Sequence, residues 1–441
     1  MTYEEARAYI GEISKTGSVL GLESIRRLMA ELSDVQEEVP VIHIAGTNGK
    51  GSTGAFLASV FQCAGLHVGR YCSPAVFDPL EVWQYDGRFI TENEYAKVMS
   101  QVKNACDIVV SKGFPAPTVF EAETAAAFVY FAEKKPDVVL LETGMGGETD
   151  ATNVIRHPLA SVITTISMDH MQFLGNTLAE IARVKAGIIK MGCPVFSAPQ
   201  AEEVTNVLQE VAKKCESSLM VTDECDYHML QEKPGNLTFS YRMREYGEVT
   251  LQTSLSGLYQ MRNASLAAET AAVLLPSLAK LDKRTALNYI QAGIAKANWP
   301  GRFEILDTDP LFILDGAHNE DAAACLFHTL QNCFTNTSLT YIIGVLADKE
   351  HEKMLRLMLP KAAQVYTVTP DNARALDGKL LAKEAMKFHD RVMYCKSLPE
   401  AIAKATVFAR RENTPILAFG SLSYLGDLKR TYQDMVGGKD D

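Results

Sequence analysis

Short apolar runs typical of buried strands alternate with amphipathic helical stretches along nearly the whole chain. The strand-like runs are residues 40–45, 138–142, 160–166, 312–315, 340–345, 363–369 and 416–419. The helical stretches are residues 51–64, 121–133, 178–190 and 261–276. Because strands that alternate with helices form parallel sheets covered by helices, the pattern predicts an α/β protein with doubly wound sheets.

Two features divide this pattern into parts. Residues 237–243 and 249–255 alternate between apolar and polar positions, which predicts a hairpin at a sheet edge. The segment Asn298–Arg302 carries a proline and a glycine together, which predicts a domain boundary. We therefore expect an N-terminal domain over residues 1–297 and a smaller Rossmann-like C-terminal domain over residues 298–441.

Composition and charge exclude several classes of protein. Of the 441 residues, 47% are hydrophobic and 22% are charged, as in a folded globular chain, and the net charge of −11 argues against a nucleic-acid partner. No apolar run approaches the ~18 residues that cross a bilayer, and the acidic start lacks the pattern of an export signal. Nine scattered cysteines without a CxxC pair indicate reduced thiols. These observations predict a cytoplasmic protein without a membrane partner, and the lack of repeats or a coiled coil favours a monomer.

A glycine-rich loop between a predicted strand and helix is the sharpest local signal. The candidate phosphate-binding residues are Gly46, Thr47, Asn48, Gly49, Lys50, Gly51, Ser52 and Thr53. Backbone N–H groups of such a loop and the start of the helix bind phosphate oxygens, and the lysine reaches the β- and γ-phosphates. The loop is a variant, because Ile44 stands where the usual pattern has glycine and Gly51 follows the lysine. It predicts a P-loop-type N-terminal domain that binds ATP.

Polar residues follow two further strands of the same predicted sheet. Glu142 ends an apolar strand, and Asp169 and His170 follow the next one. Because the carboxyl ends of parallel strands share one edge, these side chains are expected near Lys50, where a carboxylate can hold Mg²⁺ beside phosphates. A glutamate that only caps the next turn, or a histidine that only serves a loop, remains the alternative.

Lys185 occupies an unexpected position in the apolar stripe of its predicted helix. The helical period places it with Leu178, Ile181 and Ile188. Burial would lower its pKa and make a neutral amine available, which can react with CO₂ to give an anionic carbamate. The alternative is a lysine whose stem packs while its ammonium group reaches solvent.

The C-terminal half offers a second group of candidates. Asp315, His318 and Asn319 follow an apolar strand and suit hydrogen bonding to a ligand held between domains. Upstream, Asn263 with Gln260 can pair with an adenine edge, and Arg302 can neutralise phosphate.

Together these segments resemble the folylpolyglutamate synthase and dihydrofolate synthase family of Mur-type ligases. The similarity extends over most of the chain, in the order GLESI (21–25), HIAGTNGKGST (43–53), YCSP (71–74), TVFEAETAAAF (118–128), ETGMGGETDATNV (142–154), SMDHMQFLGNTLAEIARVKAGIIK (167–190), GLYQMRN (257–263), WPGRFE (299–304), DGAHN (315–319) and GVLADKE (344–350).

The resemblance implies an ATP-dependent ligase that adds L-glutamate to the terminal carboxylate of a folate through an acyl phosphate, with ATP and Mg²⁺ as cofactors. The same family also joins glutamate to dihydropteroate, and the sequence leaves both activities open. A ligase acting on a cell-wall precursor and a regulatory module that hydrolyses ATP without forming an amide are the remaining alternatives.

The resemblance also assigns roles to individual residues. Lys50, His170, Lys185 and His318 would be catalytic, with Lys185 carbamylated. The metal ligands would be Ser73, Glu142, His170 and Lys185. ATP would contact the glycine loop together with Asn263, Arg302 and Asp315. The folate, the dihydropteroate or the glutamate would contact Ser73, Pro74, Asp150, Ala151 and His318.

Three residues depart from the family pattern. Tyr259 replaces a histidine before the glutamine of the adenine segment, and Glu148 and Thr149 replace arginine and leucine of a Gly-Gly-Arg-Leu-Asp motif. An acidic residue near an anionic substrate is unexpected and raises the question of how the pterin end is held.

Overall fold

An eight-stranded sheet organises the N-terminal part of the chain in this computed structural model, which describes residues 1–13, 21–347 and 351–437. Its order is β4 (Arg88–Phe89), β3 (Trp83–Tyr85), β2 (Val68–Tyr71), β5 (Val138–Glu142), β1 (Val41–Ala45), β6 (Ala160–Ile163), β7 (Val195–Ser197) and β8 (Leu219–Val221). The strands from β2 to β8 run parallel, while β3 and β4 are antiparallel additions at one edge.

Apolar side chains of both faces of this sheet are buried under helices. Along β1, Ile42 and Ile44 belong to one core and Val41 to another, as expected where successive residues of a strand point to opposite faces. The first core includes α3 (Lys50–Cys63), α9 (Tyr259–Leu278) and α10 (Lys283–Lys296). The second includes α1 (Tyr3–Ile13), α2 (Glu23–Glu31), α4 (Glu92–Ser111) and α5 (Val119–Lys134). The helices α7 (Leu178–Ala186) and α8 (Glu202–Lys214) pack near β6 and β7, and the short α6 (Met171–Leu174) precedes them.

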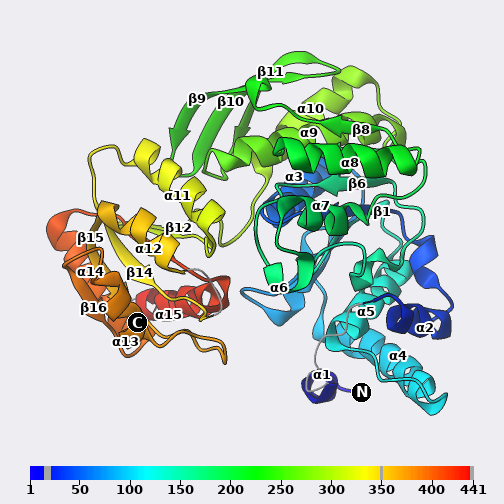
Figure 1. Cartoon of the computed structure of the whole chain (residues 1–441), viewed down its shortest axis with the longest axis horizontal. Coiled ribbons are helices and arrows are strands. Elements are labelled where there is room, and N and C mark those ends of the chain that lie inside the picture. Colours follow the sequence, from blue (N-terminus) through cyan, green and yellow to red (C-terminus); the bar gives the residue numbers. More distant parts are fainter. Residues whose placement is uncertain (14–20, 348–350, 438–441) are drawn as a thin grey trace.

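The predicted hairpin forms, and one of its two strands lies at the edge of a sheet, as predicted. The strands β9 (Tyr227–Lys233), β10 (Asn236–Met243) and β11 (Gly247–Thr253) make a separate antiparallel sheet at the top of Figure 1. Both edges of β10 are already paired, and Leu237, Phe239 and Tyr241 pack into the core shared with α9. The alternating pattern predicted the two strands correctly. Which strands they pair with is determined by packing against α9, a segment distant in the sequence.

A six-stranded sheet organises the C-terminal part, at the left of Figure 1. Its order is β12 (Glu304–Thr308), β13 (Leu311–Leu314), β17 (Ile416–Phe419), β14 (Leu339–Ile343), β15 (Ala362–Thr367) and β16 (Val392–Tyr394). Only β12 runs antiparallel to its neighbour. One face packs on α11 (Glu320–Cys333), α12 (His351–Met358) and α13 (Gly378–Ala385), and the other on α14 (Leu398–Glu412) and α15 (Leu425–Gly437). The predicted fold class, a larger parallel-sheet domain and a smaller α/β domain, is confirmed.

Two predicted elements are shorter than expected. The strand at 160–166 ends at Ile163, because the Thr165 carbonyl accepts hydrogen bonds from the glycine-loop N–H groups of Thr47 and Asn48. The helix at 178–190 ends at Ala186 with Gly187 as its cap, and the Gly187 carbonyl accepts a bond from Asn153. Within the described residues, no helix is long and apolar enough to cross a membrane. Residues 348–350 of the GVLADKE segment lie outside the described residues.

Candidate active site

The glycine loop after β1 is shaped by two positions that admit no side chain. Gly46 has φ +154°, and a Cβ there would lie 1.9 Å from Thr164 Oγ1. Gly49 has the left-handed φ of +92°, and a Cβ there would lie 2.4 Å from Asn263 Oδ1. Gly49 also caps α3, so the N–H groups of the first helical turn, which lack intrahelical acceptors, lie beside the loop. This arrangement is the usual binding site for a phosphate group at a helix start.

Lys50 is folded back over this loop and faces a carboxylate. Its Nζ donates to the carbonyl oxygens of Gly46 at 3.2 Å and Thr47 at 3.3 Å. It also lies 3.9 Å from Glu142 Oε1 at the end of β5. Burial raises the pKa of Glu142, and the charges of Lys50 and of the buried Arg70 oppose that shift. The site therefore holds two side chains of opposite charge side by side, both of them largely buried.

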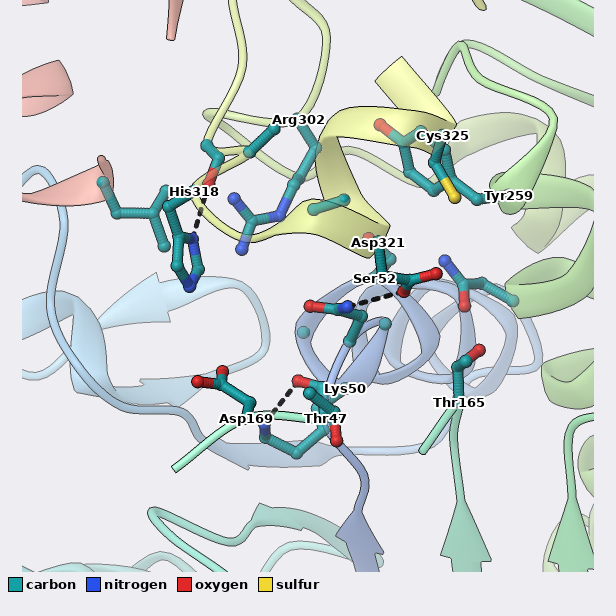
Figure 2. Close-up of a pocket in the computed structure, with 18 of the residues that line it drawn as sticks. Thr47, Lys50, Ser52, Thr165, Asp169, Tyr259, Arg302, His318, Asp321 and Cys325 are labelled. Carbon is teal, nitrogen blue, oxygen red and sulfur yellow. Dashed lines mark hydrogen bonds between the residues drawn. The ribbon is translucent and has the colours of Figure 1, made fainter. Parts of the chain in front are cut away.

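A cavity of about 220 Å³ surrounds this pair and lies between the two large sheets. Figure 2 shows Lys50 and Asp169 on one side of it and Arg302 and His318 on the other. The predicted site residues that line the cavity are Thr47, Asn48, Gly49, Lys50, Gly51, Ser52, Ser73, Pro74, Glu142, His170, Asn263, Arg302, Asp315 and His318. Two predicted ATP-binding residues do not line it, since Thr53 is fully buried in α3 and Gly46 lies behind the loop.

Three of the four donors predicted for a metal line this cavity, and the fourth, Lys185, does not. Ser73 supplies a hydroxyl, Glu142 a carboxylate and His170 an imidazole. Among the described residues, no three His, Cys, Asp or Glu side chains gather closely enough to hold a metal by themselves. Mg²⁺ in nucleotide sites is commonly held by one or two protein oxygens, with phosphates and waters completing its shell. The donor set present here fits a cation that arrives with a nucleotide.

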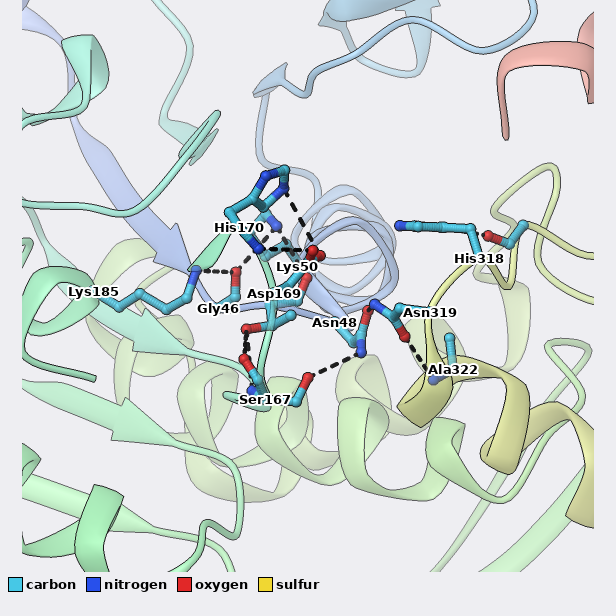
Figure 3. A network of polar contacts seen from close by, with 12 residues as sticks. Gly46, Asn48, Lys50, Ser167, Asp169, His170, Lys185, His318, Asn319 and Ala322 are labelled. Atoms are coloured by element: carbon cyan, nitrogen blue, oxygen red, sulfur yellow. Dashed lines mark hydrogen bonds and ion pairs between the residues drawn. The ribbon is translucent and has the colours of Figure 1, made fainter. Parts of the chain in front are cut away.

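Lys185 is buried, as its place in the apolar stripe predicted, and its side chain is directed toward the glycine loop. Only 3% of it is exposed, and Nζ donates to the Gly46 carbonyl oxygen at 2.9 Å. Burial, together with the nearby charge of Lys50, lowers its pKa to about 7, while Asp169 opposes the shift. Figure 3 shows Gly46 between the two lysines. The ammonium group therefore does not reach solvent, and a substantial neutral fraction is available near pH 7.

The C-terminal residues of the cavity are positioned largely by backbone contacts. The Asp315 carboxylate accepts hydrogen bonds from the N–H groups of Phe303 at 2.9 Å and Ala317 at 2.8 Å. Burial raises its pKa. The Nδ1 atom of His318 lies 2.9 Å from the Gly316 carbonyl oxygen, which orients the ring toward the cavity in Figure 2. Asp315 thus holds the chain around Arg302 and His318 in place.

Direct hydrogen bonds connect the glycine loop with the C-terminal part. Asn48 Nδ2 donates to Asp321 Oδ2 at 2.8 Å, and Asn319 Nδ2 donates to Asn48 Oδ1 at 3.3 Å. Both partners of Asn48 belong to the start of α11, where Asn319 is the cap. Figure 3 shows this connection beside Ser167. A movement of the smaller domain would therefore act directly on the loop.

The linker between the two parts also contacts the start of α3. Arg70 on β2 is buried, donates to the Gly51 carbonyl oxygen at 2.5 Å and lies 3.8 Å from the centre of the Trp299 ring. A Cβ on Gly51 would lie 2.7 Å from Trp299 Nε1. Gly51, which stands where the usual loop pattern has serine or threonine, has no side chain and so leaves room for Trp299.

Among the lining residues that were not predicted from the sequence, four have polar side chains, namely Thr165, Arg262, Asp321 and Cys325. Arg262 donates to Thr165 Oγ1 at 3.0 Å and to Glu224, so it closes one side of the cavity. Asp321 and Cys325 lie on α11, beyond the end of β13 where the predicted residues Asp315, His318 and Asn319 follow. The closeness of Asp321 to His318 in the sequence was the signal that could have identified it.

A second cavity, of about 640 Å³, adjoins the first and shares Ser73, Pro74 and Gly144 with it. It holds the remaining predicted substrate residues, Asp150 and Ala151. The Asp150 carboxylate accepts bonds from Met145 N at 2.7 Å and from the N–H and hydroxyl of Thr152. Burial raises its pKa. Four of the five predicted substrate residues, Ser73, Pro74, Asp150 and Ala151, therefore line this second chamber, whereas His318 lines only the first cavity.

The three departures from the family pattern lie in different surroundings. Tyr259 is part of the first cavity and donates to Asp315 Oδ2 at 3.4 Å, which ties the adenine segment to the smaller domain. Thr149 lines the second cavity. Glu148 is exposed and does not line either cavity, so its charge does not oppose an anionic substrate there.

Comparison with known proteins places the chain among ligases. The model for the Mur ligase middle domain matches residues 44–271, and that for the Mur ligase glutamate ligase domain matches residues 301–422. The dihydrofolate synthase/folylpolyglutamate synthase of Bacillus subtilis is 34% identical over 97% of this chain and 98% of its own length.

Two solved structures have the same fold. Mycobacterium tuberculosis folylpolyglutamate synthase in complex with ADP and AMPPCP has a TM-score of 0.88 at 29% identity, with 99% of both chains covered. A complex of an FPGS with AMPPCP and folate has a TM-score of 0.82 at 30% identity, with 98% of this chain and 100% of that chain covered.

Proposed function

This chain belongs to the folylpolyglutamate synthase and dihydrofolate synthase family of Mur ligases, and from that premise we propose that it is an ATP-dependent ligase that adds L-glutamate to the terminal carboxylate of a folate. The observation that carries the proposal is the junction of the two cavities at Ser73, Pro74 and Gly144. A long substrate in the second cavity can present its carboxylate to a nucleotide bound at the glycine loop.

In the proposed reaction a carboxylate oxygen of the folate attacks the γ-phosphorus of ATP, and the bond to ADP breaks. The glutamate amine then attacks the acyl carbon, loses a proton and expels phosphate, which leaves the amide. Lys50 and the helix start would stabilise the phosphoryl charge, and Arg302 would approach it from the smaller domain. His318, oriented by the Gly316 carbonyl, would hold the carboxylate of the glutamate. Asn263, beside Gly49, would contact the nucleotide base.

Mg²⁺ would be held by Ser73, Glu142 and His170, and it would neutralise charge on the phosphates when bound. Glu142 suits this role, because its buried carboxylate already faces the cation of Lys50 at 3.9 Å. Lys185 as a carbamate would add an anion beside Lys50 and the same metal. The support for the carbamate is the buried amine with a pKa lowered to about 7. A ¹³C-enriched CO₂ signal in wild type that is absent from Lys185→Ala would test it.

A second candidate activity is the joining of glutamate to dihydropteroate, alone or in addition. The specific observation in its favour is the dual name of the Bacillus subtilis relative, which is similar over nearly its whole length. The second cavity does not distinguish the substrates, because both carry the same ring and present a terminal carboxylate.

The test of the proposal is product analysis. The enzyme is incubated with ATP, Mg²⁺ and labelled glutamate, and tetrahydrofolate and dihydropteroate are offered in separate reactions. The products are separated by chromatography, and their masses are measured by mass spectrometry. We expect a product heavier by one glutamyl residue and phosphate release that depends on both acceptor and glutamate. Phosphate release that continues when either is omitted would refute the proposal.

Three further properties are proposed on the sequence alone. The protein acts as a monomer, which light scattering of the purified protein would test. It acts in the cytoplasm, which fractionation of the source cells would test. Its domains divide at residues 298–302, which limited proteolysis would test.

A further inference from the structure

One carboxylate of the second cavity has no part in the reaction described above. Glu123 lies on α5, on the wall of the cavity that also contains Phe120, Met145 and Val82. Within the described residues its carboxylate forms no hydrogen bond or ion pair. Glu123 is half-buried, and its carboxylate lines a ligand-sized chamber without a hydrogen-bonding partner among those residues, which points to a role with the ligand.

The other carboxylates of the chamber are already used by the protein. Glu121 Oε2 accepts bonds from Thr118 at 2.7 Å and from Ser24 at 3.0 Å, while its Oε1 is buried without a hydrogen-bond partner in the described part of the chain and has no surface open to the chamber. Asp150 is held by three bonds from Met145 and Thr152. Glu123 is therefore the carboxylate of this chamber with both oxygens left for a bound molecule.

The charged surroundings of Glu123 are sparse. Burial raises its pKa to about 7, and the positive charge of Arg7 on α1 opposes that shift. The phenols of Tyr71 on β2 and Tyr95 on α4 also lie within its electrostatic reach. Figure 1 shows α1, α4 and α5 together at the lower right, on the far side of the large sheet from the three-stranded sheet. A cationic or donor-rich ligand group would restore the charged form of Glu123.

We infer that Glu123 is a specificity-determining residue that binds the 2-amino and N3–H groups of the substrate's 2-amino-4-oxopyrimidine ring. This inference rests on the proposed function, since it takes a pteroyl compound as the substrate. The two donors are adjacent and parallel, as the two oxygens of a carboxylate require for a bidentate pair. With the ring at Glu123, the other end of the molecule extends toward Ser73 and Pro74, where the two cavities join.

The test compares Glu123→Gln with the matched control Glu133→Gln, which lies on the same helix but is exposed and paired with Lys97. For Glu123→Gln we expect the KM of the pteroyl substrate to rise about 10- to 100-fold, the usual worth of a charge-assisted pair, with the KM of ATP unchanged. The control should match wild type in both.

A substrate analogue without the 2-amino group separates recognition from a structural effect. Wild type should lose about 10-fold in pteroyl affinity toward the analogue, measured by fluorescence quenching without turnover, while Glu123→Gln should bind analogue and parent alike. Equal loss in both proteins, or a KM in Glu123→Gln within twofold of wild type, would overturn the inference. Thermal unfolding of each variant detects a folding defect, and in that case Glu123→Met, an uncharged side chain of similar length, replaces it under the same criteria. Absence of any glutamylated product from wild type would instead refute the proposed function.

Discussion

The two large sheets bring their strand ends to the same cleft, yet they present different chemistry there. The end of the eight-stranded sheet carries largely buried charges that face each other, such as Lys50 at 3.9 Å from Glu142. The end of the six-stranded sheet carries groups satisfied by their own backbone, such as Asp315, which is held by Phe303 and Ala317. A phosphoryl transfer needs charge close to the reacting atoms, and the first region supplies the paired charges of Lys50 and Glu142, while the second region supplies Arg302.

The difference indicates a division of labour between the two regions. The larger domain would stabilise charge, while the smaller one would orient the second substrate and close the cleft. Variants on either side therefore test the comparison, because charge-bearing groups of the larger domain should affect turnover more strongly than the groups of the smaller one.

The largest effect is expected from Lys50→Ala. The ammonium is the cation at the glycine loop, so its loss should lower kcat about 10³-fold or more. Single-turnover phosphate release measures the step, and circular dichroism checks the fold. A rate within tenfold of wild type would show that Lys50 does not stabilise the phosphoryl charge, and it would refute the proposed difference between the two regions.

Lys185→Ala should follow, with a loss in kcat of about 10²-fold. Its amine is buried against Gly46 and does not line the cavity, so the effect tests whether charge behind the loop matters as much as charge in it. The control is Arg183→Ala, on the same helix but exposed and paired with Glu210. Activity equal to wild type in Lys185→Ala would contradict both the carbamate and the role of the buried amine.

Glu142→Gln should change the metal requirement more than the maximal rate. Removal of the anionic donor is expected to raise the Mg²⁺ concentration for half-maximal activity about 10-fold, because Mg²⁺ prefers charged oxygen ligands. A Mg²⁺ titration at saturating ATP measures it. An unaltered titration would mean that the carboxylate serves only to pair with Lys50.

The smallest effect should come from the other side of the cleft, with Asp321→Ala. Its carboxylate is held by Asn48 of the glycine loop, so it adds negative charge where phosphates are expected. We expect the KM of ATP to fall about two- to threefold, while the neighbouring and exposed Glu320→Ala leaves it unchanged. An increase in KM beyond tenfold would show that the smaller domain contributes directly to phosphate binding.

The sequence predicted the fold and the strand-end residues because both follow from short-range patterns. Apolar runs gave β1, β5 and β6, and the rule that parallel strands end at one edge brought Lys50, Glu142 and His170 to one cavity. The helical period placed Lys185 in the apolar stripe of its helix but left open whether its ammonium group reaches solvent, and the structure buries the side chain.

What the sequence did not reveal depends on contacts between distant segments. The three-stranded sheet stands apart because β10 is paired on both sides, which alternation cannot express. Arg262 and Asp321 reach the cavity through the packing of α9 and α11, and no spacing rule connects them with the loop. Glu123 is one of many acidic residues in the chain, and only the surrounding chamber distinguishes it.

The contact of Arg70 with Trp299 has a practical consequence for anyone who dissects this protein. The tryptophan belongs by sequence to the linker, yet it completes the packing against Gly51 at the mouth of the nucleotide loop. A recombinant fragment that stops at residue 297 would expose the guanidinium of Arg70 and leave a void beside the first turn of α3. A fragment carried through Arg302 keeps that aromatic cover, so the cut for an independently expressed larger domain belongs after the linker.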